Sequence, residues 1–307
     1  MMKNNDKNFR QLAIIGPTAS GKSDLAISVA KKIDAYILSI DSLSIYKEID
    51  IVSAKPSKDE LSQVPHFGID EIYPDEYFSV DIFINLYKDV VKKCKDDGKN
   101  LVIVGGTSFY LKSLLDGLSI LPKITEDDKK IVSLKLQDLD KVYNELYSKD
   151  KDYMQKISPK DRYRIEKALL IYQASSLTPT QWFLQNPPEA IIKELDIYNI
   201  DVSRDILRNR IDKRTKKMYS MGLIDEVCYL EQKYTRGVNA MGSIGVIEVL
   251  EYLDAKIDKD KMLELISTHT AQLAKRQQTF NKTQFKDINS APLEELEDMI
   301  LSSTSNL

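Results

Sequence analysis

The feature that most restricts the fold of this 307-residue chain is a loop near its start, GPTASGKS. It occupies residues 16–23 and matches the pattern G-x-x-x-x-G-K-[ST] at every fixed position. The apolar segment QLAII precedes the loop, and a helical pattern with Leu25, Ala26 and Val29 on one face follows it. A strand, a glycine-rich turn and a helix in this order predict a parallel α/β sheet with a phosphate site at its carboxyl edge.

The chemistry of this loop is the binding of phosphate. The predicted phosphate-binding residues are Gly16, Pro17, Thr18, Ala19, Ser20, Gly21, Lys22 and Ser23. The glycines let backbone N–H groups converge on phosphate oxygens, and the following helix adds the positive end of its dipole. We expect Lys22 to neutralise the terminal phosphate and Ser23 to hold Mg²⁺ through its hydroxyl. The chain should therefore bind a phosphate or a diphosphate.

Two further predicted strands end in residues that bear on the chemistry. LVIV, residues 101–104, leads into Gly105, Gly106 and Thr107 with no carboxylate, whereas enzymes that act on a γ-phosphate usually hold the metal with an acid at such a point. YILSI is followed by Asp41. At the carboxyl edge of a parallel sheet Asp41 is either a general base that faces the phosphate or an ordinary turn residue.

The middle of the chain differs from its two ends in composition and predicted secondary structure. Charged helical segments run from about Pro122 to Ala174, and a turn-rich stretch, 177–188, follows them. We interpret residues 122–188 as an α-helical insertion. The α/β core would then consist of residues 1–121 and 189–307.

Beyond the insertion, DIYNIDV (196–202) is expected to rejoin the sheet, and helices are expected from about Ser203 and Lys259. Before the insertion, IDIVSAKP (49–56) has the pattern of a strand. Lys55 within it is interpreted as a solvated surface lysine.

Composition excludes several classes of protein. Apolar residues make up 42% and charged residues 30%, which is ordinary globular usage, and the net charge is −3. No apolar run approaches the roughly 18 residues that a membrane span needs, and the N-terminus MMKNNDKNFR lacks the apolar core of a signal peptide. Cys94 and Cys228 form no CxxC pair. We therefore expect a cytoplasmic protein with no disulfide and no membrane partner.

Several blocks in order along the chain resemble those of the tRNA dimethylallyltransferase (tRNA isopentenyltransferase) family. The P-loop is similar almost letter for letter. The other similar blocks are Asp41-Ser42 with 45–56, 64–70, 77–80, GGTSFYLKSLLDGLS (105–119), the segment around Asp161 and Arg164, 207–227 and QLAKRQ (272–277). The chain departs from the family pattern at Ser108, Val246-Ile247 and Phe280-Asn281. It has no Cys₂His₂ finger, as in bacterial members.

The resemblance implies a P-loop NTPase-like parallel sheet flanked by helices, with an inserted helical tRNA-binding domain. It implies transfer of a dimethylallyl group from dimethylallyl diphosphate to N6 of adenine 37, beside the anticodon, in the anticodon stem-loop of tRNA. Mg²⁺ would be the cofactor, and we expect a monomer. Asp41 would then take the N6 proton and Thr107 contact substrate or phosphates. Arg210 or Arg214 would clamp the diphosphate.

The same resemblance implies two groups of tRNA-binding residues. They are Asp41, Ser42, Leu43 and Ser44 after the second strand, and Tyr163, Arg164, Ile165, Glu166 and Lys167 in the insertion. For His66 a packed, hydrogen-bonded role and a substrate contact both stay open. His269 is expected to be simply exposed.

Three other functions compete with this interpretation. A P-loop small-molecule kinase using ATP is the first. A prenyltransferase acting on free AMP is the second, although the helical insertion argues against it. An RNA-binding protein with a vestigial loop is the third, and the intact Lys22, Ser23 and Asp41 argue against it.

Although the net charge is negative, two segments beyond the insertion are rich in basic residues. Between residues 204 and 217 the chain has seven basic and two acidic residues, and between 275 and 286 it has four basic residues and no acid. Together with the family resemblance, this segregation predicts basic helices that line a tRNA channel. Binding of tRNA should then weaken steeply as salt rises.

Overall fold

The structure is a computed structural model that describes residues 9–305. The N-terminal residues in which no signal peptide was predicted lie, up to Asn8, outside the described part. The chain divides into two compact units, one of them Ser113–Lys193 and the other built from the residues on either side of it. The expected insertion, 122–188, falls within the second unit.

The first unit is built on a six-stranded sheet in which every neighbouring pair is parallel. Its strands, in spatial order, are β3 (His66–Phe67), β2 (Ala35–Ser39), β4 (Asn100–Gly105), β1 (Gln11–Ile15), β5 (Asp196–Ile200) and β6 (Asn289–Ala291). The predicted parallel α/β sheet is confirmed, as are four of the five segments predicted to be strands. β3 and β6 were not predicted, because two or three residues are too few to show a periodicity.

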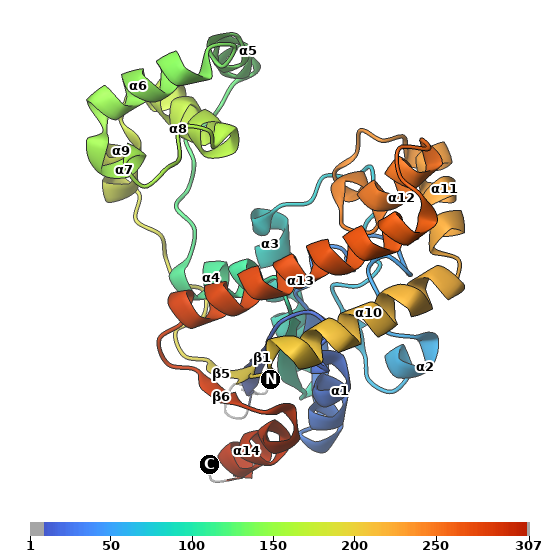
Figure 1. Cartoon of the computed structure of the whole chain (residues 1–307). Coiled ribbons are helices and arrows are strands. Elements are labelled where there is room, and N and C mark those ends of the chain that lie inside the picture. Colours follow the sequence, from blue (N-terminus) through green and yellow to red (C-terminus); the bar gives the residue numbers. More distant parts are fainter. Residues whose placement is uncertain (1–8, 306–307) are drawn as a thin grey trace. The chain divides into compact units, whose positions relative to one another are not determined.

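Helices cover the sheet and extend beyond it (Figure 1). In the first unit they are α1 (Lys22–Lys32), α2 (Lys58–Leu61), α3 (Val80–Asp97), α4 (Ser108–Asp116, which continues into the second unit), α10 (Arg204–Ser220), α11 (Leu223–Tyr234), α12 (Val246–Leu253), α13 (Lys259–Gln284) and α14 (Leu293–Ser305). One hydrophobic cluster joins α1 and α14 to the strands, with Ile14, Ile37 and Val102 fully buried in it. α3 packs against β2 and β4.

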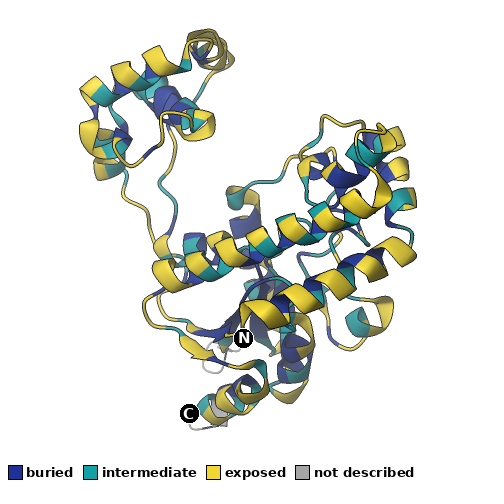
Figure 2. Cartoon of the chain, in the orientation of Figure 1, coloured by how far each residue is buried: buried dark blue, intermediate teal, exposed yellow. Residues whose placement is uncertain are grey.

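α10 and α13 begin where the sequence predicts helices, each after a capping side chain. Ser203 Oγ accepts a hydrogen bond from the backbone N–H of Ile206, and Asp258 accepts one from Lys261. The two helices lie side by side and pack through Leu207, Ile211 and Ala274 (Figure 1). Their outer faces are exposed (Figure 2).

Residues 49–56 are not a strand, so that prediction is wrong. The backbone N–H groups of Asp50, Ile51 and Val52 all donate to the carboxylate of Glu226 on α11, at 3.0, 2.8 and 2.9 Å. Three consecutive N–H groups that converge on one anion cannot alternate sides as a strand requires. The apolar residues of this loop instead belong to a second core with α11, α12 and α13.

Lys55 is also not the solvated lysine that its sequence context suggests. Its side chain is 4% exposed and forms ion pairs with Asp50 and Asp70, at 2.7 and 2.6 Å. The ammonium also donates to the carbonyl of Tyr46, at 2.7 Å. Lys55 therefore joins three loop segments that lie between β2 and α3 in the chain.

The second unit is a small helical bundle with a core of its own. Its helices are α5 (Glu126–Lys135), α6 (Leu139–Lys149), α7 (Lys151–Met154), α8 (Arg162–Ser175) and α9 (Pro179–Gln185). Val132, Leu146, Met154 and Ile165 lie in the buried cluster. α9 occupies part of the stretch expected to consist of turns, because Thr178 and Gln181 form a capping box and Pro179 favours the first helical turn.

We find no helix between residues 9 and 305 with the length and apolar character that crossing a bilayer requires. Cys94 is buried, Cys228 is exposed, and both are free thiols.

Candidate active site

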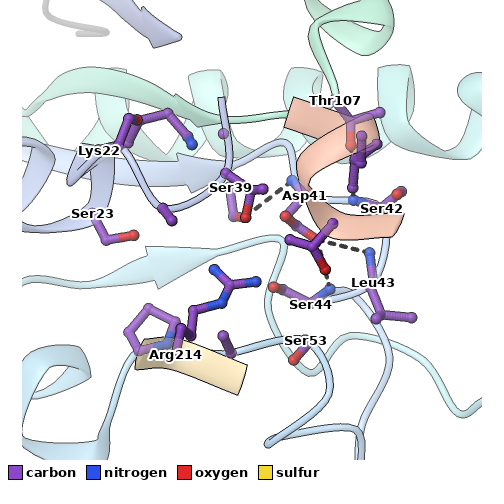
Figure 3. Close-up of a pocket in the computed structure, with 18 of the residues that line it drawn as sticks. Lys22, Ser23, Ser39, Asp41, Ser42, Leu43, Ser44, Ser53, Thr107 and Arg214 are labelled. Atoms are coloured by element: carbon purple, nitrogen blue, oxygen red, sulfur yellow. Dashed lines mark hydrogen bonds between the residues drawn. The ribbon is translucent and has the colours of Figure 1, made fainter. Parts of the chain in front are cut away.

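Three loops of the first unit meet at the carboxyl edge of the sheet. The P-loop follows β1, the Gly105-Gly106-Thr107 turn ends β4, and the Asp41 turn follows β2. These strands are adjacent in the order β2, β4, β1, so their carboxyl ends bring the loops together. They line a cavity of about 370 Å³, to which residues of α10 and α13 also contribute. Lys22, Asp41 and Arg214 point towards its middle (Figure 3).

The P-loop has the backbone that its glycines allow. Gly21 immediately precedes α1 with φ 95°, which a residue with a side chain rarely adopts, and a Cβ there would lie 2.7 Å from Leu293 Cδ2. Ala19 also has a positive φ, 62°, which is uncommon for alanine and must be held by the surroundings. The loop thus wraps the start of α1, whose N-terminus attracts anions.

Lys22 is the cation of this loop. Its ammonium donates to the carbonyl of Pro17 at 2.6 Å, so the side chain folds back over the loop. Burial lowers the pKa of Lys22 to about 8, Asp41 opposes that shift, and Arg214 adds to it. A bound anion would stabilise the charged form and offset the burial.

The two carboxylate oxygens of Asp41 have different surroundings. Oδ1 accepts hydrogen bonds from the backbone N–H groups of Leu43 and Ser44, at 2.9 and 3.2 Å (Figure 3). Within the described residues Oδ2 accepts none. Of the two readings of Asp41, the turn role is therefore present, and it leaves one carboxylate oxygen for a proton or a cation. Thr107 Oγ1 accepts from the N–H of Ser42 at 3.2 Å and ties the β4 turn to this segment.

Arg210 and Arg214 lie one helical turn apart on α10 but contact different things. Nη1 of Arg210 donates to the carbonyls of Ser20 and Ala19, at 3.1 and 3.5 Å, and thereby holds the P-loop backbone where Ala19 has its positive φ. Arg214 instead lines the cavity. Burial lowers the pKa of its guanidinium and Asp41 opposes that shift. The geometry therefore separates a loop-supporting arginine from one that faces the ligand space.

The donor set suits a magnesium ion that takes most of its ligands from a substrate. Between residues 9 and 305 there is no group of three or more His, Cys, Asp or Glu side chains that could hold a metal by themselves. The Ser23 hydroxyl and the Asp41 carboxylate do line the same cavity. Mg²⁺ is commonly bound by one or two protein oxygens together with substrate phosphates and water.

The structure places the two histidines differently from each other. His66 is half-buried and lines the cavity; its Nδ1 lies 2.7 Å from the carbonyl of Val64, and burial lowers its pKa. His66 thus contacts its own backbone segment and also faces the cavity. His269 is 41% exposed, but it is not simply a surface residue. Its Nδ1 lies 2.5 Å from a carboxylate oxygen of Glu248, which is 2% exposed.

The stretch in the second unit expected to bind tRNA forms the first turns of α8. Tyr163 is 70% exposed, and the ammonium of Lys167 lies 5.4 Å from its ring centroid. Arg164 is also exposed, whereas Ile165 is fully buried in the core of the bundle. Tyr163, Arg164 and Lys167 are thus side chains of this stretch that a partner can reach.

Gln277 on α13 lines the cavity, although the sequence did not mark it as a site residue. Its side-chain amide contacts the backbone of both the P-loop and the β4 turn. The available signal was its position at the end of the QLAKRQ block, but a glutamine in a helix has no intrinsic chemistry that points to a site. Only the fold brings it there.

Comparison with known proteins gives a consistent result. Residues 44–284 match the sequence model of the IPP transferase family. The tRNA dimethylallyltransferase of Sulfurimonas denitrificans is 69% identical over 95% of this chain and 99% of that protein, and that of a Sulfurovum species is 55% identical over 95% and 98%. The crystal structure of a tRNA delta(2)-isopentenylpyrophosphate transferase from Staphylococcus epidermidis has a TM-score of 0.69 at 30% identity, covering 97% of this chain and 99% of that chain.

Proposed function

The chain belongs to the IPP transferase family, and from this membership we propose that it transfers a dimethylallyl group from dimethylallyl diphosphate to N6 of adenine 37 in tRNA. It is a transferase that modifies tRNA. One observation supports placing the reaction in this cavity. A P-loop with Lys22, a half-buried Arg214 and the carboxylate of Asp41 line one space at the carboxyl edge of the sheet.

The cavity suits the departure of a diphosphate. An allylic diphosphate reacts as its C1–O bond breaks and positive charge develops at C1, so stabilising the leaving diphosphate lowers the barrier. We assign this task to the P-loop N–H groups of residues 19–21, to Lys22 and to Arg214. Arg210 supports the loop through the carbonyls of Ala19 and Ser20.

The proton balance of the reaction gives Asp41 its role. As the N6–C1 bond forms, the adenine amine loses a proton, and Oδ2 of Asp41 is proposed to accept it. Oδ1 stays bound to two backbone N–H groups, which fixes the orientation of the carboxylate. Thr107 is proposed to hold the Ser42 segment and to face the substrate. The adenine must leave its stack to reach this space.

Magnesium would be held by the Ser23 hydroxyl, which lines this cavity, and by diphosphate oxygens. The ion would neutralise charge on the departing diphosphate. The P-loop residues would hold the diphosphate so that its oxygens lie next to the Ser23 hydroxyl.

The exposed basic residues are proposed to bind the tRNA backbone. On α10, Arg210 and Arg214 turn inward and are half-buried, while the other five basic residues between 204 and 217 are exposed. In the second unit Tyr163, Arg164 and Lys167 are the proposed contacts with the anticodon stem-loop. We propose a cytoplasmic enzyme that acts as a monomer, because one chain lines the whole cavity.

The test is nucleoside mass analysis of tRNA after incubation with the protein, Mg²⁺ and dimethylallyl diphosphate. The expected product is N6-dimethylallyladenosine at position 37. An Asp41→Asn variant should bind tRNA as the wild type does but transfer about 10²-fold more slowly, since it cannot accept the proton. Unmodified tRNA in this assay, together with turnover of ATP in a parallel incubation that contains ATP, would favour the kinase alternative. An unchanged rate in the variant would remove the base role.

A further inference from the structure

A single side chain of α13 joins the two turns that form the cavity. Oε1 of Gln277 accepts a hydrogen bond from the backbone N–H of Thr18 in the P-loop, at 2.8 Å. Nε2 of the same amide donates to the carbonyl of Gly106 in the β4 turn, at 3.0 Å. Thr18 and Gly106 are backbone positions on different loops, so Gln277 fixes their separation from a third element.

The β4 turn is shaped to receive this amide. A Cβ on Gly106 would overlap Nε2 of Gln277, so the glycine leaves the space that the amide occupies. Because that atom is the far end of a flexible side chain, an alanine at 106 would push the amide aside. It would not force the backbone to move.

The contacts made by Gln277 extend through the β4 turn to the segment that contains Asp41. Thr107 follows Gly106 directly, and its Oγ1 accepts from the N–H of Ser42, the residue after Asp41. The turn that holds Asp41 is thus connected through Thr107 and Gln277 to the loop that holds Lys22. In the proposed reaction these two loops hold the base and the leaving diphosphate, respectively.

We propose that Gln277 is a positioning residue that sets the spacing between the bound diphosphate and the Asp41 turn. The inference rests on the proposed function, because it takes its meaning from those two groups. Rates of group transfer depend on the alignment of reacting atoms, and a displacement of about 1 Å costs about 10²-fold. Diphosphate binding depends mainly on Lys22, Arg214 and P-loop donors that Gln277 does not provide. Loss of the bridge should therefore lower kcat more than it raises KM.

The first experiment compares Gln277→Ala with Gln278→Ala. Gln278 is the neighbouring residue on α13, and its amide also donates to a backbone carbonyl, that of Val202, at 3.0 Å. It controls for the loss of one anchor of the helix. We expect kcat of Gln277→Ala to fall by about 10- to 100-fold with KM for dimethylallyl diphosphate within about threefold. Gln278→Ala should keep the wild-type kcat.

The second experiment uses Gln277→Glu, whose behaviour depends on pH. A protonated carboxyl has one acceptor and one donor oxygen, like the amide, whereas the ionised form cannot donate to Gly106. The ratio of its kcat to that of the wild type should rise as pH is lowered towards about 5, near the range where glutamate titrates. The same ratio for Gln277→Ala should stay flat. A melting curve of each variant shows whether it is folded.

Gly106→Ala supplies an independent route to the same defect. It should lower kcat as Gln277→Ala does, and the double variant should be no worse than either alone, because both remove one bridge. Wild-type kcat in Gln277→Ala, parallel pH profiles for Gln277→Glu and wild type, or additive losses would each overturn the inference. If the wild type itself forms no N6-dimethylallyladenosine, it is the proposed function that fails.

Discussion

The properties of individual cavity residues depend on their positions in the fold. Lys22 lies in a loop that the sequence alone identifies, yet its pKa of about 8 comes from burial against neighbours on other elements. Arg210 and Arg214 are equivalent in sequence, four residues apart on one helix. In the structure one supports the P-loop backbone and the other faces the cavity.

The pKa of Lys22 leads to a prediction about pH. The free enzyme keeps the ammonium protonated below about 8 and loses the charge above it, because the pKa is lowered from 10.5. The kcat/KM for dimethylallyl diphosphate should therefore fall as pH rises through about 8, since that parameter reports the ionisations of the free enzyme.

Lys22→Arg tests the assignment, because arginine stays charged across this range. Steady-state kinetics between about pH 6.5 and 9.5 should show a lower overall kcat/KM for the variant but no decline above pH 8. A decline of the same size in the variant would assign the ionisation to another group.

At the scale of elements, the strands agree with the predictions from the sequence, and the main error lies in a loop. The strands β1, β2, β4 and β5 were predictable because buried parallel strands are short apolar runs with clear ends. Residues 49–56 also contain apolar residues, but the N–H groups of 50–52 bind the carboxylate of Glu226, some 175 residues further along the chain. Such a contact leaves no periodicity in either segment, so the sequence could not show it.

The anchoring of this loop predicts an effect on stability. Glu226→Ala removes the acceptor of three backbone hydrogen bonds, from Asp50, Ile51 and Val52. We expect the free energy of unfolding to fall by about 2–4 kcal/mol, since hydrogen bonds to charged groups are worth more than neutral ones. Urea unfolding followed by circular dichroism measures the change.

Asp225→Ala is the matched control for that measurement. Asp225 lies in the same first turn of α11 and has the same charge, but it is exposed and accepts none of these bonds. Its removal should change the stability by less than about 0.5 kcal/mol. Equal losses in the two variants would attribute the effect to the helix dipole.

At the scale of the whole molecule, the mildly acidic net charge of −3 conceals two basic helices. The basic residues between 275 and 286 are all exposed, as are most of those between 204 and 217. α10 and α13 lie side by side, so these residues gather on neighbouring helices of one unit (Figure 1). The distribution supports the proposed contact with tRNA phosphates.

Binding of tRNA should therefore depend strongly on salt. We expect the Kd to rise by more than about 10²-fold between about 50 and 200 mM salt, because each phosphate contact releases counterions. Lys275→Ala should reduce the slope of log Kd against log salt by about 0.7–0.9. Lys261, on the same helix but paired with Glu264, is the control and should leave the slope unchanged when replaced by alanine. A flat titration for the wild type would contradict a phosphate-based interface.

The amino-acid sequence was sufficient for the glycine-rich turn between a strand and a helix and for the parallel sheet. These features depend on groups close together in the chain: the N–H groups of one turn, the dipole of the next helix, and the apolar runs of single strands. The tertiary structure alone decided that Gln277 bridges two loops, that Arg214 rather than Arg210 faces the cavity, and that the side chain of Lys55 is buried. Gln277 and Thr18 are 259 residues apart, and only packing of α13 over the sheet edge brings them into hydrogen-bonding distance.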